Sequence, residues 1–170
     1  IPSIIYGLFG MIFFVVFLKW AYSLMAGAAT GAIMVLPTIL STTKEALDSV
    51  PDSFREGRFA LGTGKLRTIF KVFLPAAVPG ILSGIILAIG RIVGETAALL
   101  YTSGTATRGL TKGLMSSGRT LAVHMYTISS EGFHTKQTFA TAVILLIFVF
   151  IINTLSSVAA KQISKKAGGQ

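Results

Sequence analysis

Four long apolar stretches alternate with polar segments along the chain. A helix needs about 20 mostly apolar residues to cross the hydrocarbon core of a bilayer. Three of the stretches reach that length, whereas the first is shorter and requires tilting or local thinning of the bilayer. The pattern predicts an all-α, polytopic transmembrane helix bundle, a single domain over residues 1–170. The expected spans cover residues 4–18, 21–40, 76–100 and 138–160.

The amino-acid composition also indicates a membrane protein. Hydrophobic residues make up 52% of the chain, charged residues 12%, and the mean hydropathy is +0.76. Soluble domains carry about 25% charged residues, so the alternative of buried core helices in a soluble protein is disfavoured. The chain has no cysteine, which excludes disulfides and thiolate metal sites. His124 and His134 fit no zinc-binding spacing, and we expect both to be solvated loop residues. Because the sequence begins at Ile1, we expect further helices before it.

The net charge of +9 could indicate a nucleic-acid partner, but basic and aromatic residues do not alternate as in single-strand binders. The distribution of the basic residues along the chain instead indicates which segments lie on the cytoplasmic side of the membrane. The segments 41–75 and 161–170 hold nine basic residues, against five on the opposite side, and basic residues favour the cytoplasm. We therefore expect a cytoplasmic loop over 41–75, a cytoplasmic tail over 161–170 and an outer loop over 102–137. The basic outer loop suits attraction of an anion, contact with headgroups or contact with an acidic protein surface.

Glycines four residues apart predict where membrane helices pack. Small residues at this spacing let two backbones approach closely, which supplies much of helix association in lipid. Two of the three pairs fall in the third apolar stretch, which predicts a central position for that helix. The pairs are Gly27 with Gly31, Gly80 with Gly84, and Gly90 with Gly94.

The loop over residues 41–75 predicts a helical hairpin. Pro51 suits a first helical turn, and Gly62 suits the turn between two short helices. The second helix is expected to run through about Val72, and Pro75 marks the entry to the third span. Gly62 to Lys65 reads GTGK, but it lacks the spacing and hydroxyl residue of a phosphate-binding loop. The sequence therefore predicts no nucleotide site on this chain.

The loop over residues 41–75 resembles a loop that is typical of a known family. The pattern Glu56-Gly57-Arg58-x3-Gly62-x9-Val72-x-Leu74-Pro75 resembles the EAA loop of ABC-transporter permeases, E-A-A-x3-G-x9-I-x-L-P. Gly57 and Arg58 replace two alanines, and Val72 replaces isoleucine. Three further stretches are similar to the phosphate branch, first the PstA type and then the PstC type. They are residues 2–9, residues 45–57 and Arg91-x-x-Gly94-Glu95-Thr96-Ala97.

The resemblance implies a type I importer permease with a MetI-like fold in the bacterial inner membrane, N-terminally incomplete here. Two such permeases pair, a cytoplasmic PstB-like ATPase dimer binds ATP, and an external binding protein delivers phosphate. The second permease would be PstC-like. No cofactor, metal or catalytic residue is expected on this chain. The residues implied to contact the ATPase are Glu56, Gly57, Ala60, Gly62, Leu74 and Pro75. An amphipathic hairpin lying on headgroups is the alternative.

A candidate substrate path follows from charges in the third stretch. Arg91 and Glu95 are four residues apart and would share a helical face, and each costs about 2.5–3.5 kcal/mol inside a membrane. Arg91 could bind an oxyanion through its planar fork, and Glu95 would temper it. A structural ion pair is the alternative. Thr96 adds a hydroxyl, although Thr96 and Thr102 are as well explained by bonds to their own backbone.

Several functions remain open from the sequence. An arginine can bind sulfate or molybdate as well as phosphate, so the transported oxyanion is not fixed. The chain could also be the PstC-type partner. An ATPase-independent anion channel would need no elaborate hairpin. A non-transporting scaffold would not need Arg91 or Glu95.

Overall fold

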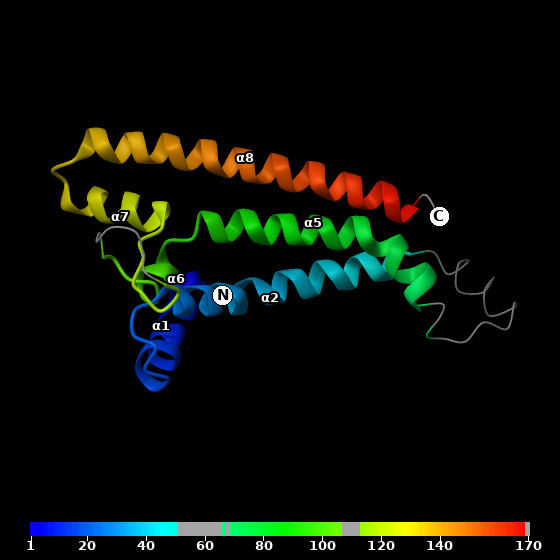
Figure 1. Cartoon of the computed structure of the whole chain (residues 1–170), viewed down its shortest axis with the longest axis horizontal. Coiled ribbons are helices and arrows are strands. Elements are labelled where there is room, and N and C mark those ends of the chain that lie inside the picture. The colour runs from blue at the N-terminus through cyan, green and yellow to red at the C-terminus, as the bar shows by residue number, and fades with distance from the viewer. Residues whose placement is uncertain (51–65, 67–68, 107–112, 169–170) are drawn as a thin grey trace, which may run out of the picture. The chain divides into compact units, whose positions relative to one another are not determined.

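The computed structural model describes residues 1–50, 66, 69–106 and 113–168, and every regular element in those residues is a helix. The expected all-α fold is confirmed. The elements are α1 (Ser3–Gly10), the π-helix η1 (Met11–Phe17), α2 (Leu24–Asp48), the π-helix η2 (Ile69–Phe73), α5 (Leu74–Val93), α6 (Ala97–Leu100), α7 (Leu121–Glu131) and α8 (Thr135–Gly168) (Figure 1).

Three of these helices are long and apolar enough to cross a membrane: Leu24–Asp48, Leu74–Val93 and Thr135–Lys165. Among the described residues, the third of them has 0% of its most apolar window buried. Ser3–Phe17 is a shorter apolar helix, and the expected first span over 4–18 stays a prediction. The prediction of one helix over 76–100 was wrong at its C-terminal end, because α5 ends at Val93.

The chain forms two compact units. One consists of residues 1–36 and 90–151, and the other of residues 37–89 and 152–170. The division within α2 falls before Pro37, which lies inside that helix. Proline removes a helical N–H and crowds the preceding turn, so it is a natural place for such a helix to change its neighbours.

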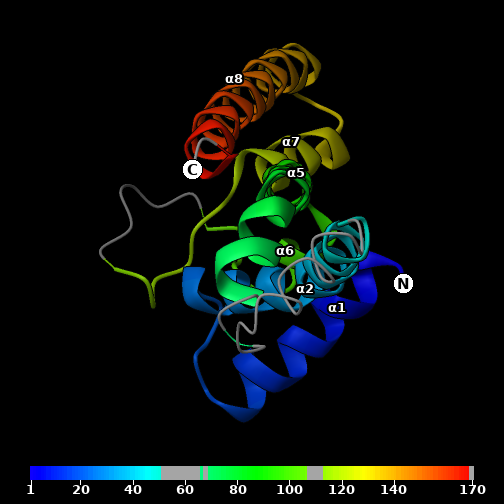
Figure 2. The ribbon, with the colours of Figure 1, turned by 90° about the vertical axis from the view of Figure 1, so that its right-hand side faces the viewer.

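In the first unit, α1 packs against α6 through small residues (Figures 1 and 2). A Cβ on Gly7 would lie 2.8 Å from the Ala98 Cα, and one on Gly10 would lie 2.8 Å from the Thr30 Cγ2. Since real Cβ atoms do not approach so closely, any larger residue at Gly7 would push the two backbones apart.

Aromatic residues shape the chain between α1 and α2. Phe13 stacks on Phe9 and Phe17 with ring centroids 5.6 and 5.8 Å away, and Phe14 stacks on Trp20. The Leu18 N–H donates to the Phe13 carbonyl at 2.9 Å, five residues back. Lys19 and Ala21 then take positive φ angles of 56° and 55°, which reverse the chain into α2.

In the second unit, α2 and α5 meet through the predicted glycine pair. A Cβ on Gly80 would lie 2.5 Å from the Ala46 Cβ, and one on Gly84 would lie 2.8 Å from the Thr42 Cβ. The close approach expected for this pair is thereby confirmed. Gly31 differs, because a Cβ there would have Ile92 Cδ1 at 3.9 Å as its nearest neighbour, an ordinary contact.

The expected outer loop over 102–137 contains a helix that its polar sequence did not predict. The Thr120 side chain caps α7 by accepting from the Val123 N–H at 3.2 Å. Gly132 ends the helix in the left-handed conformation, at a φ of 73°, where a side chain would be strained. The chain then turns into α8 (Figure 1).

Candidate functional site

The candidate path residues lie where α5 gives way to α6, within the first unit. Helix α5 ends at Val93, the Glu95 N–H turns back to the Ile92 carbonyl at 3.1 Å, and α6 begins at Ala97. Thr96 occupies the N-cap position without a capping bond from its own side chain. The Gly94-Glu95-Thr96 segment is therefore a break between two helices.

Glu95 takes over the role of a capping residue. Its Oε1 atom accepts a hydrogen bond from the Ala98 N–H at 3.1 Å. The first N–H groups of a helix have no partner inside the helix and favour a carboxylate. The half-buried Glu95 side chain thus stabilises the start of α6.

The prediction that Arg91 and Glu95 share a helical face was wrong. Arg91 lies in the last turn of α5 and is exposed, whereas Glu95 follows the end of that helix. Among the described residues no ion pair joins Arg91 to Glu95, so the structural ion pair is not observed. Their roles toward an anion stay predictions, with the guanidinium and the carboxylate separated by the helix break.

Four buried hydroxyl groups lie in the same unit as this break. Each is bonded to nearby backbone, as for Thr102, whose Oγ1 donates to the Ala98 carbonyl at 2.8 Å. Thr30 donates in the same way to the Ala26 carbonyl at 2.8 Å. The expectation that Thr102 serves its own backbone is confirmed. The four most buried hydroxyl residues are Ser23, Thr30, Thr102 and Ser103.

The N-terminus of α2 is closed by backbone carbonyls. The N–H groups of Ser23, Leu24 and Met25 donate to the carbonyls of Thr102, Ser116 and Leu114 at 2.9–3.1 Å. This helix end therefore has no N–H to offer to an anion there. The sequence did not reveal the arrangement, although Ser23, Ala26, Gly27 and Thr30 form a row of small residues along one face of α2.

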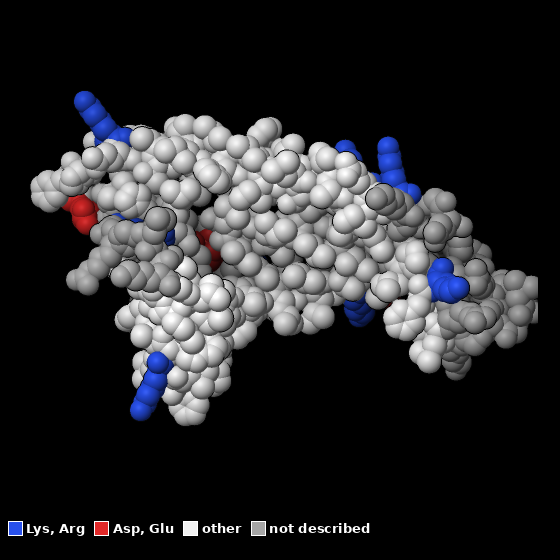
Figure 3. Space-filling model, viewed as in Figure 1, with Lys and Arg blue, Asp and Glu red and all other residues white. Residues whose placement is uncertain are grey.

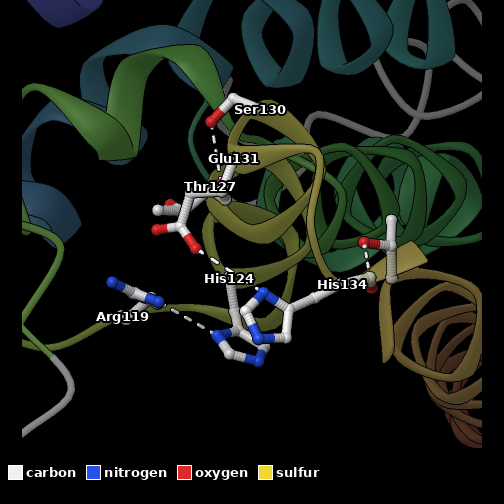
Figure 4. A network of polar contacts seen from close by, with 7 residues as sticks. Arg119, His124, Thr127, Ser130, Glu131 and His134 are labelled. Atoms are coloured by element: carbon white, nitrogen blue, oxygen red, sulfur yellow. Dashed lines mark hydrogen bonds and ion pairs between the residues drawn. The ribbon is translucent and has the colours of Figure 1, made fainter. Parts of the chain in front are cut away.

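Arg119 joins the preceding segment to α7. Its Nε donates to the Thr105 carbonyl at 2.9 Å, and its Nη1 lies 3.1 Å from the His124 Nδ1 (Figure 4). Arginine has no acceptor, so the His124 Nδ1 must accept and the proton of a neutral ring must reside on Nε2. The prediction that His124 is a solvated loop residue was wrong, because it is a half-buried residue of α7.

A depression of about 560 Å³ opens beside α6 in the same unit. Tyr101, which directly follows α6, contributes to its wall. The other lining residues are Tyr22, Leu100, Gly104, Thr105, Ala106 and Ser117. None of these described lining residues is charged, and the basic residues Arg108 and Lys112 lie outside the described residues.

A family model described as the inner membrane component of binding-protein-dependent transport systems matches residues 1–168. The chain belongs to this family. It is a multi-pass protein of the inner membrane. Relatives of this permease are transport subunits, and no solved structure matches the chain.

Curated relatives carry two kinds of name. The permease is 35% identical over 144 residues to the probable ABC transporter permease protein YqgI of Bacillus subtilis (strain 168), covering 78% of this chain and 49% of that protein. It is 40% identical over 160 residues to the phosphate transport system permease protein PstA of Yersinia pestis, covering 92% of this chain and 53% of that protein. A PstA homolog of Mycoplasma pneumoniae is 38% identical over 167 residues, 92% of this chain and 25% of that protein. The chain spans about half or less of the length of these relatives.

The predicted ATPase-contacting residues divide between described and undescribed segments. Glu56, Gly57, Ala60 and Gly62, with the predicted hairpin, lie outside the described residues. Leu74 and Pro75 lie in the first turn of α5. At that position the missing N–H group of a proline costs no helical hydrogen bond.

The start of α5 is anchored by an apolar cluster in the permease. Its buried members are Ala46, Val50 and Ala77, and Leu47, Phe73 and Ile81 pack against them. Phe73 ends η2, directly before Leu74. A displacement of the chain before Phe73 would therefore act on both α2 and α5, since the cluster contains residues of both.

Proposed function

We propose that this permease is a membrane-spanning subunit of an ATP-driven, binding-protein-dependent importer of phosphate. The observation that carries the proposal is 40% identity to a phosphate transport system permease protein over 160 residues, 92% of this chain. The EAA-like pattern from Glu56 to Pro75 supports ATP coupling, because its spacing matches the loop of ABC permeases throughout.

The proposed partners follow from the same machine. A PstB-like ATPase dimer binds and hydrolyses ATP, a PstC-like permease completes the path, and an external binding protein delivers phosphate. This chain itself acts without a cofactor and without a catalytic residue. Residues Glu56, Gly57, Ala60 and Gly62 would insert between the helices of the ATPase, a helix-in-groove contact.

The apolar cluster suits the transmission of that movement. Leu74 and Pro75 begin α5, and Phe73 packs against the cluster shared by α2 and α5. Cores of this kind are closely packed and shift as units. Movement of the coupling loop would thereby tilt two spanning helices together.

Arg91, Glu95 and Thr96 are the proposed path residues. The exposed guanidinium of Arg91 is available to donate two hydrogen bonds to a tetrahedral oxyanion. The Glu95 carboxylate, held by the Ala98 N–H, would repel the same anion and speed its release. Transport needs binding that is favourable yet weak enough to reverse.

The test is uptake of radiolabelled phosphate into proteoliposomes that contain the full-length permease, its partner permease, the ATPase and the binding protein. We expect uptake only with ATP and no inhibition by sulfate. Uptake without ATP would replace the importer by an anion channel, and ATP-dependent sulfate uptake would replace the cargo.

Two variants separate coupling from the path. Gly62→Leu is expected to abolish uptake while the complex still assembles, and Arg91→Ala is expected to reduce uptake at least tenfold. Lys136→Ala removes an exposed charge from α8 and serves as the matched control. Normal uptake by Gly62→Leu would contradict the coupling role, and normal uptake by Arg91→Ala would contradict the path.

A further inference from the structure

A groove of about 520 Å³ lies between α5 and the C-terminal part of α8, within the second unit. Helix α5 contributes Pro79, Ser83 and Ile86. Helix α8 contributes, among others, Val158, Lys161 and Lys165. Among the described coupling and path residues, which are Leu74, Pro75, Arg91, Glu95 and Thr96, none lines the groove, so the groove requires its own explanation.

The groove combines two chemistries. Pro79, Ile86 and Val158 give it an apolar wall, and none of the described residues that line it is acidic. Lys161 and Lys165 stand four residues apart, so their ammonium groups extend from one face of α8. Both are exposed, and in the part of the chain that the structure describes neither has an acidic partner. Like charges at this spacing repel each other, which a bound anion would relieve.

Hydroxyl groups lie between the apolar wall and the lysines. Ser157 and Ser164 of α8 line the groove, as does Ser83 of α5. The Ser83 Oγ donates its proton to the Pro79 carbonyl at 3.0 Å, so Ser83 does not donate to a ligand. The hydroxyls of Ser157 and Ser164 beside two ammonium groups form a donor set suited to phosphate oxygens.

The position along α8 indicates where the phosphate comes from. Lys161 and Lys165 directly follow the apolar stretch of a membrane-capable helix whose most apolar window is 0% buried. Figure 3 shows the change from an uncharged surface along α8 to basic side chains near its C-terminal end. This is the level of the lipid headgroups, and basic clusters at that level on the cytoplasmic side attract anionic lipids.

We propose that this groove binds one anionic phospholipid. The headgroup phosphate would lie between Lys161 and Lys165, with a hydroxyl of Ser157 or Ser164 completing the contacts. One acyl chain would follow the wall formed by Pro79, Ile86 and Val158. Free phosphate shares the headgroup's chemistry but has no use for that apolar wall, which favours a lipid.

Native mass spectrometry of the full-length permease within its complex tests the proposal. Phosphatidylglycerol and phosphatidylcholine are titrated separately into the delipidated complex in detergent. We expect one phosphatidylglycerol to bind preferentially. Removing two basic residues at the membrane surface is expected to weaken phosphatidylglycerol binding by about thirtyfold. The variant is Lys161→Gln with Lys165→Gln, and the matched control is Lys136→Gln at the other end of α8.

A second pair of variants tests the apolar wall without changing charge. Ser83→Leu fills the groove and is expected to lower phosphatidylglycerol binding, whereas Leu87→Phe enlarges an exposed α5 residue outside the groove lining. Equal binding of the two lipids, or no change in the double lysine variant, would overturn the proposal. Displacement of the lipid by millimolar inorganic phosphate would also overturn it, in favour of a free oxyanion site. None of these outcomes depends on transport activity.

Discussion

At the scale of residues, Glu95 has a different role in the structure from the one that its sequence spacing suggests. In the sequence it is a carboxylate four residues after an arginine in an apolar stretch, which suggests a helical ion pair. In the structure its Oε1 atom caps α6 through the Ala98 N–H, and Arg91 belongs to the preceding helix. The pairing failed as a prediction because the spacing is meaningful only while the helix continues, and it ends at Val93.

Replacing Glu95 separates its cap from its charge. Glu95→Ala removes the acceptor and is expected to lower the free energy of unfolding by about 0.5–2 kcal/mol, the usual effect of losing an N-cap. Glu95→Gln keeps an oxygen acceptor and should remain near the original stability. Denaturant titration of the permease in detergent measures both. Equal stability of all three proteins would show that the capping bond contributes nothing.

Arg119 supports a second residue-scale prediction. A lysine cannot bond the Thr105 carbonyl and the His124 ring together, because it lacks the planar fork. Arg119→Lys is therefore expected to speed amide hydrogen exchange at residues 113–120 and in the first turn of α7, with α8 unchanged. Lys136→Arg, a conservative change at an exposed site, is the control. Unchanged exchange in the Arg119 variant would refute the bridging role.

At the scale of elements, small residues decide which helices touch. The α2–α5 contact relies on Gly80 and Gly84, and the α1–α6 contact relies on Gly7. The predicted glycine pairs did not all behave alike. Gly94 lies in the helix break with only the Gly90 carbonyl near an added Cβ, at 3.9 Å. Spacing identifies candidates, but the facing helix determines which glycines are needed.

Two alanine substitutions compare a glycine that is tightly packed against a neighbouring helix with one that has free space around it. Gly80→Ala would place a methyl group 2.5 Å from the Ala46 Cβ and is expected to destabilise the permease by about 1–3 kcal/mol. Gly31→Ala meets nothing closer than 3.9 Å and should be neutral or stabilising by up to about 1 kcal/mol, since alanine favours helices. Thermal unfolding in detergent compares them. The reverse order of stability would contradict the α2–α5 contact.

At the scale of the whole molecule, three membrane-capable helices set the topology. The loop between α2 and α5 and the end of α8 must lie on one side of the membrane, and α7 on the other, if α2, α5 and α8 all span. The excess of basic residues over 41–75 and 161–170 predicts that the first side is the cytoplasmic one. This conclusion does not depend on how Ser3–Phe17 meets the bilayer.

Cysteine labelling checks that topology, because the chain has no cysteine of its own. Ser130→Cys near the end of α7 and Lys165→Cys near the end of α8 replace exposed residues. An impermeant maleimide added to intact spheroplasts is expected to label the first variant, and the second only after permeabilisation. The opposite pattern would invert the orientation.

The sequence by itself determined the helical class, the approximate position of the apolar helices and the family resemblance. These features depend on composition, apolar runs and motif spacing, which act through residues near one another in the chain. It also anticipated the Gly80–Gly84 contact, because spacing on one helix suffices to present both glycines together. Helix α7 was not predicted, because its eleven residues contain no apolar run long enough to cross a membrane.

Tertiary structure decided which helices touch and which carbonyls close the start of α2. Both depend on segments far apart in the sequence, such as Gly7 against Ala98 and the Ser23 N–H against the Thr102 carbonyl. A buried N–H or C=O must find a partner, but local sequence does not specify a partner that lies on another helix. The groove between α5 and α8 arises in the same way, because two helices distant in sequence bring its apolar wall and its lysines together.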